Sequence, residues 1–274
     1  MYVSVAVMDT GIFRHMDFDT RIAGFADFVG RKKYLYDDNG HGTHVARIIA
    51  GSGKGSNGKY RGIAPDTFLV SVKVLDKSGN GKIENVVEAA GWIIENKSAM
   101  NIRVVNISFG TRAKMENGPA IETGEDDYAL IMAVEKMWDS GIVVVAAAGN
   151  NGPGNTSVTA PGISKKIITV GAFDDKNFFS GRGPTRECIV KPEVVVTGSN
   201  IIACNNHQGR YSSKSGTSMA APVVSGAVAR LIKNNPDITP KEVKIWMKSC
   251  CKKINVPSEK QGWGVLDIRK FVTG

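Results

Sequence analysis

The sequence alternates between short runs rich in valine and isoleucine and longer segments with helical periodicity, and this alternation limits the possible folds. The apolar runs are Tyr2–Met8, Phe68–Leu75, Val104–Phe109, Ile142–Ala148, Ile167–Ala172 and Glu193–Val196. They are nearly continuous rather than alternating, which is typical of strands covered on both faces. Strands that alternate with helices are joined by right-handed crossovers. We therefore predict an α/β fold with a doubly wound, mostly parallel sheet flanked by helices.

Helical patterns fill the intervals between these runs. The earlier ones are Val45–Ala50, Glu84–Asn96 and Asp127–Trp138. Thr217–Lys233 consists of small and apolar residues, so we expect a helix buried on nearly all sides, with Pro222 tolerated only near its first turn. Thr239 and Glu242 have the spacing of a capping box, with proline at the first helical position, and predict the start of a further helix.

Length and charge set limits on the kind of protein. The chain has 274 residues, with no evident linker or repeat, so we expect a single domain over residues 1–274. Its formal net charge is +9, but the basic residues are scattered and lack interleaved aromatic residues. This pattern favours a solvated basic surface over nucleic-acid binding. No apolar run is long enough to span a membrane.

The cysteines and the first residues bear on the cellular compartment. The cysteines, Cys188, Cys204, Cys250 and Cys251, have no zinc-binding spacing, so we expect reduced structural thiols. The chain opens at Met1 without a basic segment or an apolar segment of signal length, and we expect neither an export signal nor a pro-segment. A cytoplasmic location is the first expectation, and a trimmed catalytic domain of a secreted protein is the alternative.

Polar residues follow several of the predicted strands, where ligands bind in a doubly wound sheet. Asp9 follows the first run, Ser108-Phe109-Gly110 the third and Gly149-Asn150 the fourth. His41 and Ser218 each begin a predicted helix and are the remaining candidates. The sequence therefore predicts a reaction centre at the carboxyl ends of the strands.

Three segments resemble the signature blocks of the subtilisin-like serine proteases, and they occur in the order Asp, His, Ser that is known for that family. They are Asp9-Thr10-Gly11, His41-Gly42-Thr43-His44-Val45-Ala46 and Gly216-Thr217-Ser218-Met219-Ala220-Ala221-Pro222. Ala147-Ala148-Gly149-Asn150 resembles a further family segment and lies between the last two. The resemblance spans essentially the whole chain, and Gly51–Pro65 is most similar to the intracellular bacterial branch. It implies a subtilisin-like fold and serine endopeptidase activity.

The residue types fit this chemistry independently of the resemblance. A serine hydroxyl needs a base to become a nucleophile, and histidine titrates close to neutral pH. We expect Ser218 to be the nucleophile, His41 the general acid and base, and Asp9 the carboxylate that orients the imidazole. Asn150 and the backbone N–H of Ser218 are expected to bind the oxyanion, and the reaction passes through an acyl-enzyme.

Each of these residues also has a structural interpretation when taken alone. A strand-end aspartate can cap a turn, a histidine at a helix start can be structural, and an asparagine after glycine is common in turns. Their joint occurrence in order favours catalysis. We interpret His44 as structural, and we expect His15 and His207 at the surface.

Substrate binding is expected along the same strand ends. An extended peptide can add its backbone beside Ser108-Phe109-Gly110 as an additional strand. The resemblance implies that this segment lines the pocket for the side chain before the scissile bond (P1), together with Ala147, Ala148, Gly149 and Gly162. These residues are small or uncharged, so we expect apolar or mid-sized P1 side chains. The resemblance also suggests a cis peptide bond at Ala160-Pro161.

The predicted chemistry requires no cofactor, but the resemblance raises the question of structural calcium. Asp17 matches one family ligand position and is the candidate here. It is the single evident carboxylate, whereas Ca²⁺ takes roughly six to eight oxygen ligands, and Gly51–Tyr60 is rich in glycine, serine and lysine. Arg47 stands where the family usually has a small glycine, so a bulky charge must find room near that helix. Calcium binding at Asp17 stays an alternative.

Three other functions remain open at this point. A narrow-specificity maturation protease would keep the chemistry and cleave one precursor or leader peptide. A pseudoenzyme would bind peptides without hydrolysis, and an acyl transferase would pass the acyl group to an amine. The polar stretch Met115–Asp126 is expected to be a loop, and the sequence does not indicate an oligomeric state.

Overall fold

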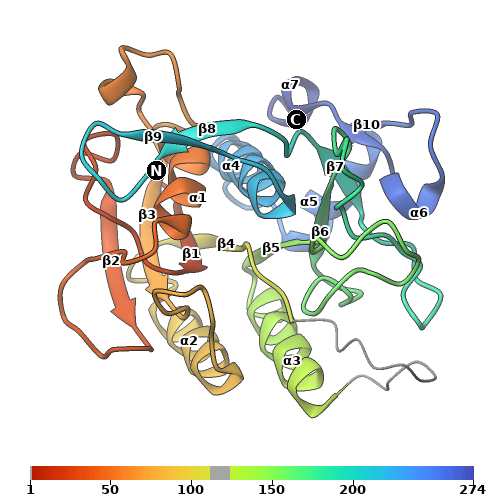
Figure 1. The fold of residues 1–274 in the computed structure, drawn as a ribbon, viewed down its shortest axis with the longest axis horizontal. Coiled ribbons are helices and arrows are strands. Elements are labelled where there is room, and N and C mark those ends of the chain that lie inside the picture. The colour runs from red at the N-terminus through yellow and green to blue at the C-terminus, as the bar shows by residue number, and fades with distance from the viewer. Residues whose placement is uncertain (1, 112–123) are drawn as a thin grey trace.

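The fold is known from a computed structural model, which describes residues 2–111 and 124–274 (Figure 1). Its main sheet contains β1 (Ser4–Asp9), β2 (Ile22–Asp27), β3 (Phe68–Lys73), β4 (Ile102–Ile107), β5 (Val143–Ala147), β6 (Ile168–Ala172), β7 (Val194–Val196), β10 (Cys251–Lys252) and β11 (Val265–Leu266). The strand order is β10-β11-β7-β6-β5-β4-β1-β3-β2, and only β10 and β11 pair antiparallel. The predicted α/β, mostly parallel, doubly wound sheet is confirmed.

The helices cover both faces of this sheet. They are α1 (His41–Ala50), α2 (Ile83–Asn96), α3 (Glu125–Asp139), α4 (Thr217–Asn234), α5 (Pro240–Ser249), the short α6 (Ser258–Gln261) and α7 (Ile268–Phe271). A 3₁₀ turn, η1 (Lys54–Ser56), follows α1. Helices α2 and α3 lie on one face, and α1 and α4 lie on the other (Figure 1). Residues 115–123 of the predicted polar loop lie outside the described residues, and α3 begins two residues before the predicted helix.

Several parts of the fold were not predicted from the sequence, among them β2 and the β8–β9 pair. Strand β2 is an edge strand whose residues are mostly half-buried, so it lacks the continuous apolar run of the inner strands. A separate antiparallel pair, β8 (Ile201–Cys204) and β9 (Tyr211–Lys214), crosses over the α1 side of the molecule (Figure 1). Both segments are short and partly exposed, which weakens the hydrophobic signal of a strand.

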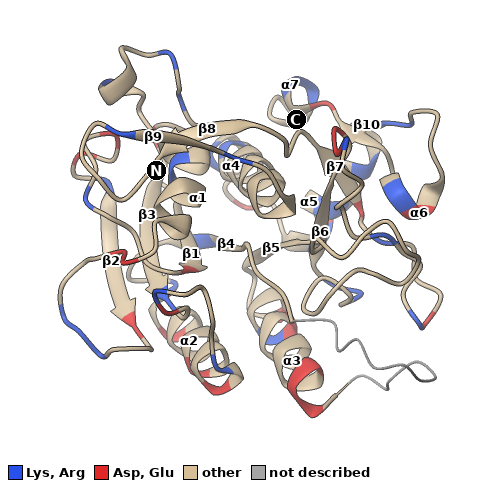
Figure 2. Cartoon of the chain, viewed as in Figure 1, with Lys and Arg blue, Asp and Glu red and all other residues tan. Residues whose placement is uncertain are grey.

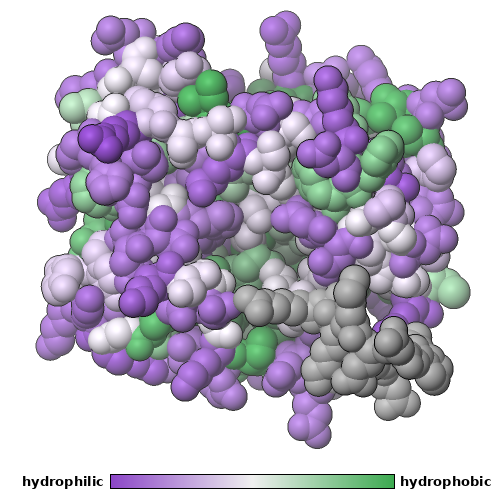
Figure 3. Space-filling model, viewed as in Figure 1, coloured by the Kyte–Doolittle hydropathy of each residue, from purple (hydrophilic) through white to green (hydrophobic). Residues whose placement is uncertain are grey.

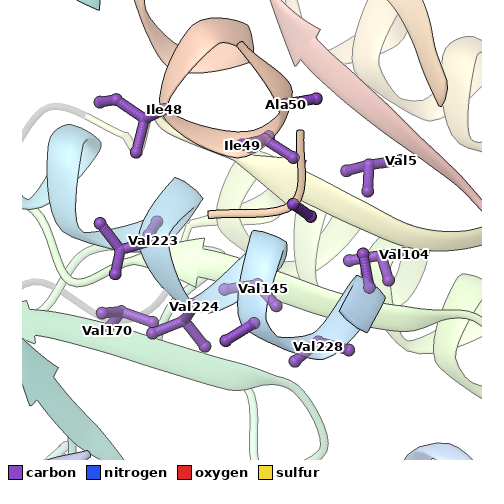
Figure 4. Packing of buried hydrophobic residues seen from close by; sticks show 14 of the residues in the cluster. Val5, Ile48, Ile49, Ala50, Val104, Val145, Val170, Val223, Val224 and Val228 are labelled. Atoms are coloured by element: carbon purple, nitrogen blue, oxygen red, sulfur yellow. The ribbon is translucent and has the colours of Figure 1, made fainter. Parts of the chain in front are cut away.

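The core on the α1 and α4 face explains the valine-rich runs. Branched side chains from the strands, such as Val104 and Val145, meet Ile49 of α1 and Val224 of α4 (Figure 4). Each of these four side chains is at most 1% exposed. Complete burial of one such side chain contributes about 1.5–3 kcal/mol, so this interface fixes both helices against the sheet.

Helix α4 contains Pro222 as its sixth residue, one turn deeper than the position predicted to tolerate it. Proline has no N–H, so it leaves the carbonyl of the residue four positions earlier without an intrahelical donor. That residue is Ser218, and its carbonyl oxygen instead accepts a hydrogen bond from Ser108 Oγ at 3.0 Å. The side chain of Ser108 therefore compensates for the proline.

The strand register brings the candidate residues to one edge of the sheet. Met8 of β1 is paired with Ile107 of β4, and Ile107 is paired with Ala146 of β5. Because these strands are parallel, the residues that follow them, including Asp9 and Ser108, meet at a common edge.

The surface agrees with the expectations drawn from composition. Lysines and arginines are distributed over loops and helices without forming one basic face (Figure 2). The face shown in Figure 3 is mostly hydrophilic and is hollowed near its middle. Among the described residues, no helix combines the length and apolar character needed to cross a bilayer. All of the cysteines are free, as expected.

Candidate active site

Asp9 and His41 form a close pair at the carboxyl end of β1. Nδ1 of His41 lies 2.8 Å from Oδ1 and 2.9 Å from Oδ2 of Asp9. The Asp9 carboxylate is fully buried, and its Oδ1 also accepts the backbone N–H of Thr10 at 2.7 Å. With Nδ1 bound to the carboxylate, Nε2 is the nitrogen left to exchange a proton.

The environment of His41 changes its proton affinity in two opposing ways. Burial of the imidazole disfavours the charged form, whereas the charge and the hydrogen bond of Asp9 favour it. The carboxylate prevails, and the pKa of His41 lies above its ordinary value. This is the direction that a general base needs if it is to hold a proton during a reaction.

Asp37 holds this pair in place, and the sequence analysis did not identify it. Its carboxylate accepts hydrogen bonds from the hydroxyls of Thr10 at 2.9 Å and Thr43 at 2.5 Å, and from the backbone N–H of Gly40 at 2.8 Å. It thereby joins the loop after Asp9 to the start of α1. An acidic residue just before a helix N-terminus is the one signal that could have indicated this role.

Ser218 is the second residue of α4, which packs on the same face as α1. Its hydroxyl donates a hydrogen bond of 2.8 Å to the carbonyl oxygen of Ser108. Within the part of the chain that the structure describes, no hydrogen bond joins His41 to Ser218. The structure thus brings Ser218 to the edge beside Asp9 and directs its hydroxyl to the end of β4.

Asn150 lies just beyond β5, next to the start of α4. Its Oδ1 accepts the backbone N–H of Thr217 at 3.0 Å and the Thr217 hydroxyl at 3.1 Å. The Thr217 hydroxyl in turn accepts the backbone N–H of Gly149 at 3.1 Å. Because the amide oxygen is occupied in this way, the NH₂ group of Asn150 is directed away from Thr217. Thr217 is a second positioning residue that the sequence analysis missed.

The predicted substrate-binding segments meet around Thr159. The backbone N–H of Thr159 donates to Ala148 O at 3.2 Å, and the N–H of Thr111 donates to Ala160 O at 3.0 Å. A Cβ added to Gly110 would lie 2.2 Å from Thr159 Oγ1, and one added to Gly149 would lie 2.7 Å from it. The Thr159 side chain therefore fills the space between these two glycines.

A cleft runs along this wall, and only some of the predicted residues line it. Phe109 and Gly110 do so together with Thr159, whereas Ser108, Ala147, Ala148 and Gly162 are buried behind the surface. Glu135 of α3 also lines the cleft, and it accepts a hydrogen bond from Ser164 Oγ at 2.7 Å. The sequence analysis expected uncharged residues in the pocket, so it did not predict this acid. The Ala160-Pro161 peptide bond is cis, as predicted.

The remaining histidines differ in their burial. His44 is buried, its Nε2 contacts Ser212 O at 3.1 Å, and burial lowers its pKa to about 4, which agrees with a neutral structural role. His207 is exposed, as predicted. The prediction for His15 was wrong, because its ring is 1% exposed and packs edge-on against Phe18 and Tyr211.

Asp17, the candidate calcium ligand, is surrounded by hydrogen-bond donors. Its Oδ1 accepts the backbone N–H of Gly55 at 2.7 Å, and its Oδ2 accepts the hydroxyl of Tyr211 at 3.0 Å. Arg47 Nε lies 3.5 Å from the same Oδ2. Calcium requires a shell of oxygen acceptors. The residues present around Asp17 therefore do not fit a calcium ion.

Comparison with known proteins shows that this chain is similar to serine proteases. A model of the subtilase family matches residues 2–264. The serine protease AprX of Bacillus subtilis (strain 168) is 42% identical over an alignment of 274 positions, which covers 90% of this chain and 60% of AprX. Subtilisin DY of Bacillus licheniformis is 34% identical over 244 residues, or 88% of this chain and 81% of that protein.

Solved structures give the same result for the fold. A cold-adapted subtilisin-like serine proteinase matches with a TM-score of 0.76 and 29% identity, over 96% of this chain and 86% of that one. Sphericase matches with a TM-score of 0.80 and 25% identity, over 96% and 90% of the two chains. The chain spans about 60% of the length of AprX, so AprX contains regions without a counterpart here.

Proposed function

Because the chain belongs to the subtilase family of serine proteases, we propose that it cleaves peptide bonds with a triad of Ser218, His41 and Asp9. The observation that carries this proposal is the contact of both Asp9 oxygens with Nδ1 of His41, beside the start of the helix that bears Ser218. A buried carboxylate in this position fixes the imidazole tautomer and stabilises the imidazolium.

The reaction begins with a change in the Ser218 side chain. Its hydroxyl leaves the carbonyl of Ser108 and turns about the Cα–Cβ bond toward His41. Catalytic hydrogen bonds are often long or poorly aligned without substrate and tighten when it binds. His41 Nε2 then takes the hydroxyl proton while Oγ attacks the substrate carbonyl carbon.

The tetrahedral intermediate carries its negative charge on the former carbonyl oxygen. The NH₂ group of Asn150 and the backbone N–H of Ser218, near the positive end of the α4 dipole, donate hydrogen bonds to that oxygen. His41 returns its proton to the leaving amine, which departs and leaves the acyl-enzyme. Water, deprotonated by His41, then hydrolyses the ester and restores Ser218.

The cleft supports a preference for apolar or mid-sized P1 side chains. An extended peptide beside Phe109 and Gly110 directs its P1 side chain toward Thr159, which occupies the space between Gly110 and Gly149. The threonine limits the depth available to a large side chain. Glu135 already accepts a hydrogen bond from Ser164, which reduces its availability to a basic P1 residue.

Labelling with a fluorophosphonate tests the proposal. We expect one label per chain, on Ser218, and no label in the Ser218→Ala and His41→Ala variants. Cleavage of a peptide library should disappear in the same variants. Peptidase activity that persists in purified Ser218→Ala would contradict the assignment of the nucleophile.

The same experiment separates the other functions. Full labelling without cleavage of casein or of a peptide library would favour a narrow maturation protease. Amide formation with added amines, in place of hydrolysis, would favour an acyl transferase. Peptide binding without any labelling would favour a pseudoenzyme.

A further inference from the structure

A buried ion pair connects helix α1 to the loop after β1. The side chains of Arg47 and Asp17 are 4% and 0% exposed, and Nε lies 3.5 Å from Oδ2. An isolated buried charge is strongly unfavourable, so each of these two groups depends on the other. The pair is independent of the catalytic residues in its chemistry, although Arg47 lies on the helix that begins at His41.

The guanidinium of Arg47 has partial compensation from its surroundings, since its Nε and Nη2 have no hydrogen-bond partner among the described residues. Its Nη1 donates to the carbonyl of Ile202 in β8 at 3.3 Å. The rings of Tyr60 and Tyr211 lie 5.8 and 5.7 Å from the guanidinium carbon, which is within cation–π distance. The guanidinium of Arg47 thus links helix α1 to the loop near residue 60 and to the β8–β9 pair.

The glycine-rich segment after α1 is shaped around this side chain. A Cβ added to Gly51 would lie 2.8 Å from Arg47 Cγ, so the absence of a side chain there makes room for the arginine stem. Further along the segment, the backbone N–H of Gly55 donates to Asp17 Oδ1 at 2.7 Å. The segment therefore supplies space for Arg47 and a donor for Asp17.

Asp17 also belongs to a second buried group, which resembles a metal site. Ligand atoms of His15, Asp17 and Cys204 lie within 4.8 Å of one another. However, both ring nitrogens of His15 face backbone N–H groups, of Asp17 at 3.1 Å and Gly209 at 3.1 Å. Burial lowers the pKa of His15 and raises that of Cys204.

The formal charges of the buried ion pair already balance. Asp17 contributes one negative charge and Arg47 one positive charge. A divalent cation at Asp17 would meet the guanidinium at close range and leave an excess positive charge in a buried space. We propose that Arg47 acts as the internal cation of this site and stabilises the fold in the role that a calcium ion would otherwise fill.

Thermal unfolding tests this proposal in the Ser218→Ala background, which prevents self-digestion. We expect the Tm of this protein to stay unchanged in EDTA and after addition of excess Ca²⁺ or Zn²⁺. Elemental analysis of the purified protein should find neither metal in stoichiometric amount. If EDTA lowers the Tm and Ca²⁺ or Zn²⁺ restores it, the proposal is overturned.

Substitutions separate charge pairing from packing. Arg47→Met keeps most of the side-chain volume and leaves Asp17 unpaired, so we expect the Tm to fall by about 10 °C. Asp17→Asn combined with Arg47→Met should recover at least half of that loss, because no buried charge remains. Arg31→Met is the matched control: Arg31 pairs with Glu88 at the surface, with both side chains more than half exposed, and we expect a shift of about 2 °C or less.

Equal losses of Tm in Arg47→Met and in the double variant would contradict charge pairing and indicate a packing role. If Arg47→Met fails to fold, the single variant Asp17→Asn gives the same information. It leaves Arg47 without its carboxylate, and it should lower the Tm by several degrees in metal-free buffer. An unchanged Tm in Asp17→Asn would overturn the proposal.

Discussion

Ser108 and Ser218 exchange two hydrogen bonds across the carboxyl edge of the sheet. The Ser218 hydroxyl donates to Ser108 O at 2.8 Å, and the Ser108 hydroxyl donates to Ser218 O at 3.0 Å. The second bond satisfies the carbonyl that Pro222 leaves without a helical donor. A residue that the sequence assigned to substrate binding thus holds the start of the helix that carries the proposed nucleophile.

Ser108→Ala should therefore lower both stability and turnover. The substitution leaves Ser218 O and the side-chain amide of Asn106, which donates to Ser108 Oγ at 2.9 Å, without their partner. Loss of partners for such buried groups costs about 1–3 kcal/mol in unfolding free energy. We also expect kcat to fall several-fold, because the first turn of α4 is no longer fixed.

Ser225→Ala is the control for this prediction. Ser225 donates to Asn106 Oδ1 at 2.9 Å, in the same buried chain but away from the Ser218 carbonyl. Denaturant unfolding should show a loss of stability in both variants, while peptide hydrolysis should show a loss of kcat in Ser108→Ala alone. A similar kcat in both variants would show that Ser108 does not position Ser218.

Asp9→Asn should reduce kcat by a factor on the order of 10⁴, the size of the effect known for the equivalent substitution in another serine protease. The neutral amide cannot stabilise the imidazolium. The pH profile gives a second readout: His41 must be unprotonated to act as base, so activity rises with pH through its raised pKa. Without the carboxylate, this acid limb should move to lower pH, and an unmoved limb would argue against Asp9 as its cause.

Asn150→Ala should lower kcat by a factor on the order of 100 to 1000, the size of the effect known for loss of an oxyanion-hole asparagine in a subtilisin, with little change in KM. The amide contributes only when the oxyanion forms, so ground-state binding should be preserved. Steady-state kinetics with one peptide substrate measures both parameters. A rise in KM with unchanged kcat would instead assign Asn150 to substrate binding.

Thr159→Gly should change the P1 preference toward larger side chains. Removing this side chain opens the space between Gly110 and Gly149, and each additional methylene that fits contributes about 1 kcal/mol, or several-fold in kcat/KM. Thr159→Val, which has nearly the same shape, should keep the original preference. Peptides that differ only at P1 provide the measurement, and identical profiles for all three proteins would exclude Thr159 from the pocket.

His44 should make the folded state sensitive to moderate acid. Its pKa is about 4 in the folded protein and roughly 6.5 when unfolded, so the unfolded state binds the proton more tightly. Stability is therefore full above roughly pH 6.5 and falls as the pH decreases toward about 4, by on the order of 3 kcal/mol. His44→Gln should remove this contribution, and the difference between the two unfolding curves across this pH range isolates it.

Much of the fold could be predicted because strands that are buried on both faces of a parallel sheet consist mainly of apolar residues. The runs that form β1, β3, β4, β5, β6 and β7 are mostly apolar and buried. The capping box of α5 depends on residues three positions apart, and the structure contains both of its hydrogen bonds. A motif of this kind can be recognised in the sequence because all of its residues lie within a few positions of one another.

The sequence also indicated the candidate catalytic residues, through motifs tied to strand and helix ends. It did not single out Asp37, whose hydrogen-bond partners Thr10 and Thr43 lie in other segments. It could not indicate Thr159, whose role depends on two glycines in other segments. The same applies to Arg47, which the sequence marked as an unexplained charge. Its partner Asp17 lies on a different element, and the tyrosines around it come from two further segments.

The sequence alone therefore determined most of the inner strands and the larger helices, and it indicated the candidate reactive side chains, because short-range patterns of polarity carry that information. The tertiary structure decided the strand order, the residues that support each candidate reactive group and the pairing of Arg47 with Asp17. These depend on contacts between residues far apart in the chain, and such contacts exist only after the sheet has brought its strand ends together.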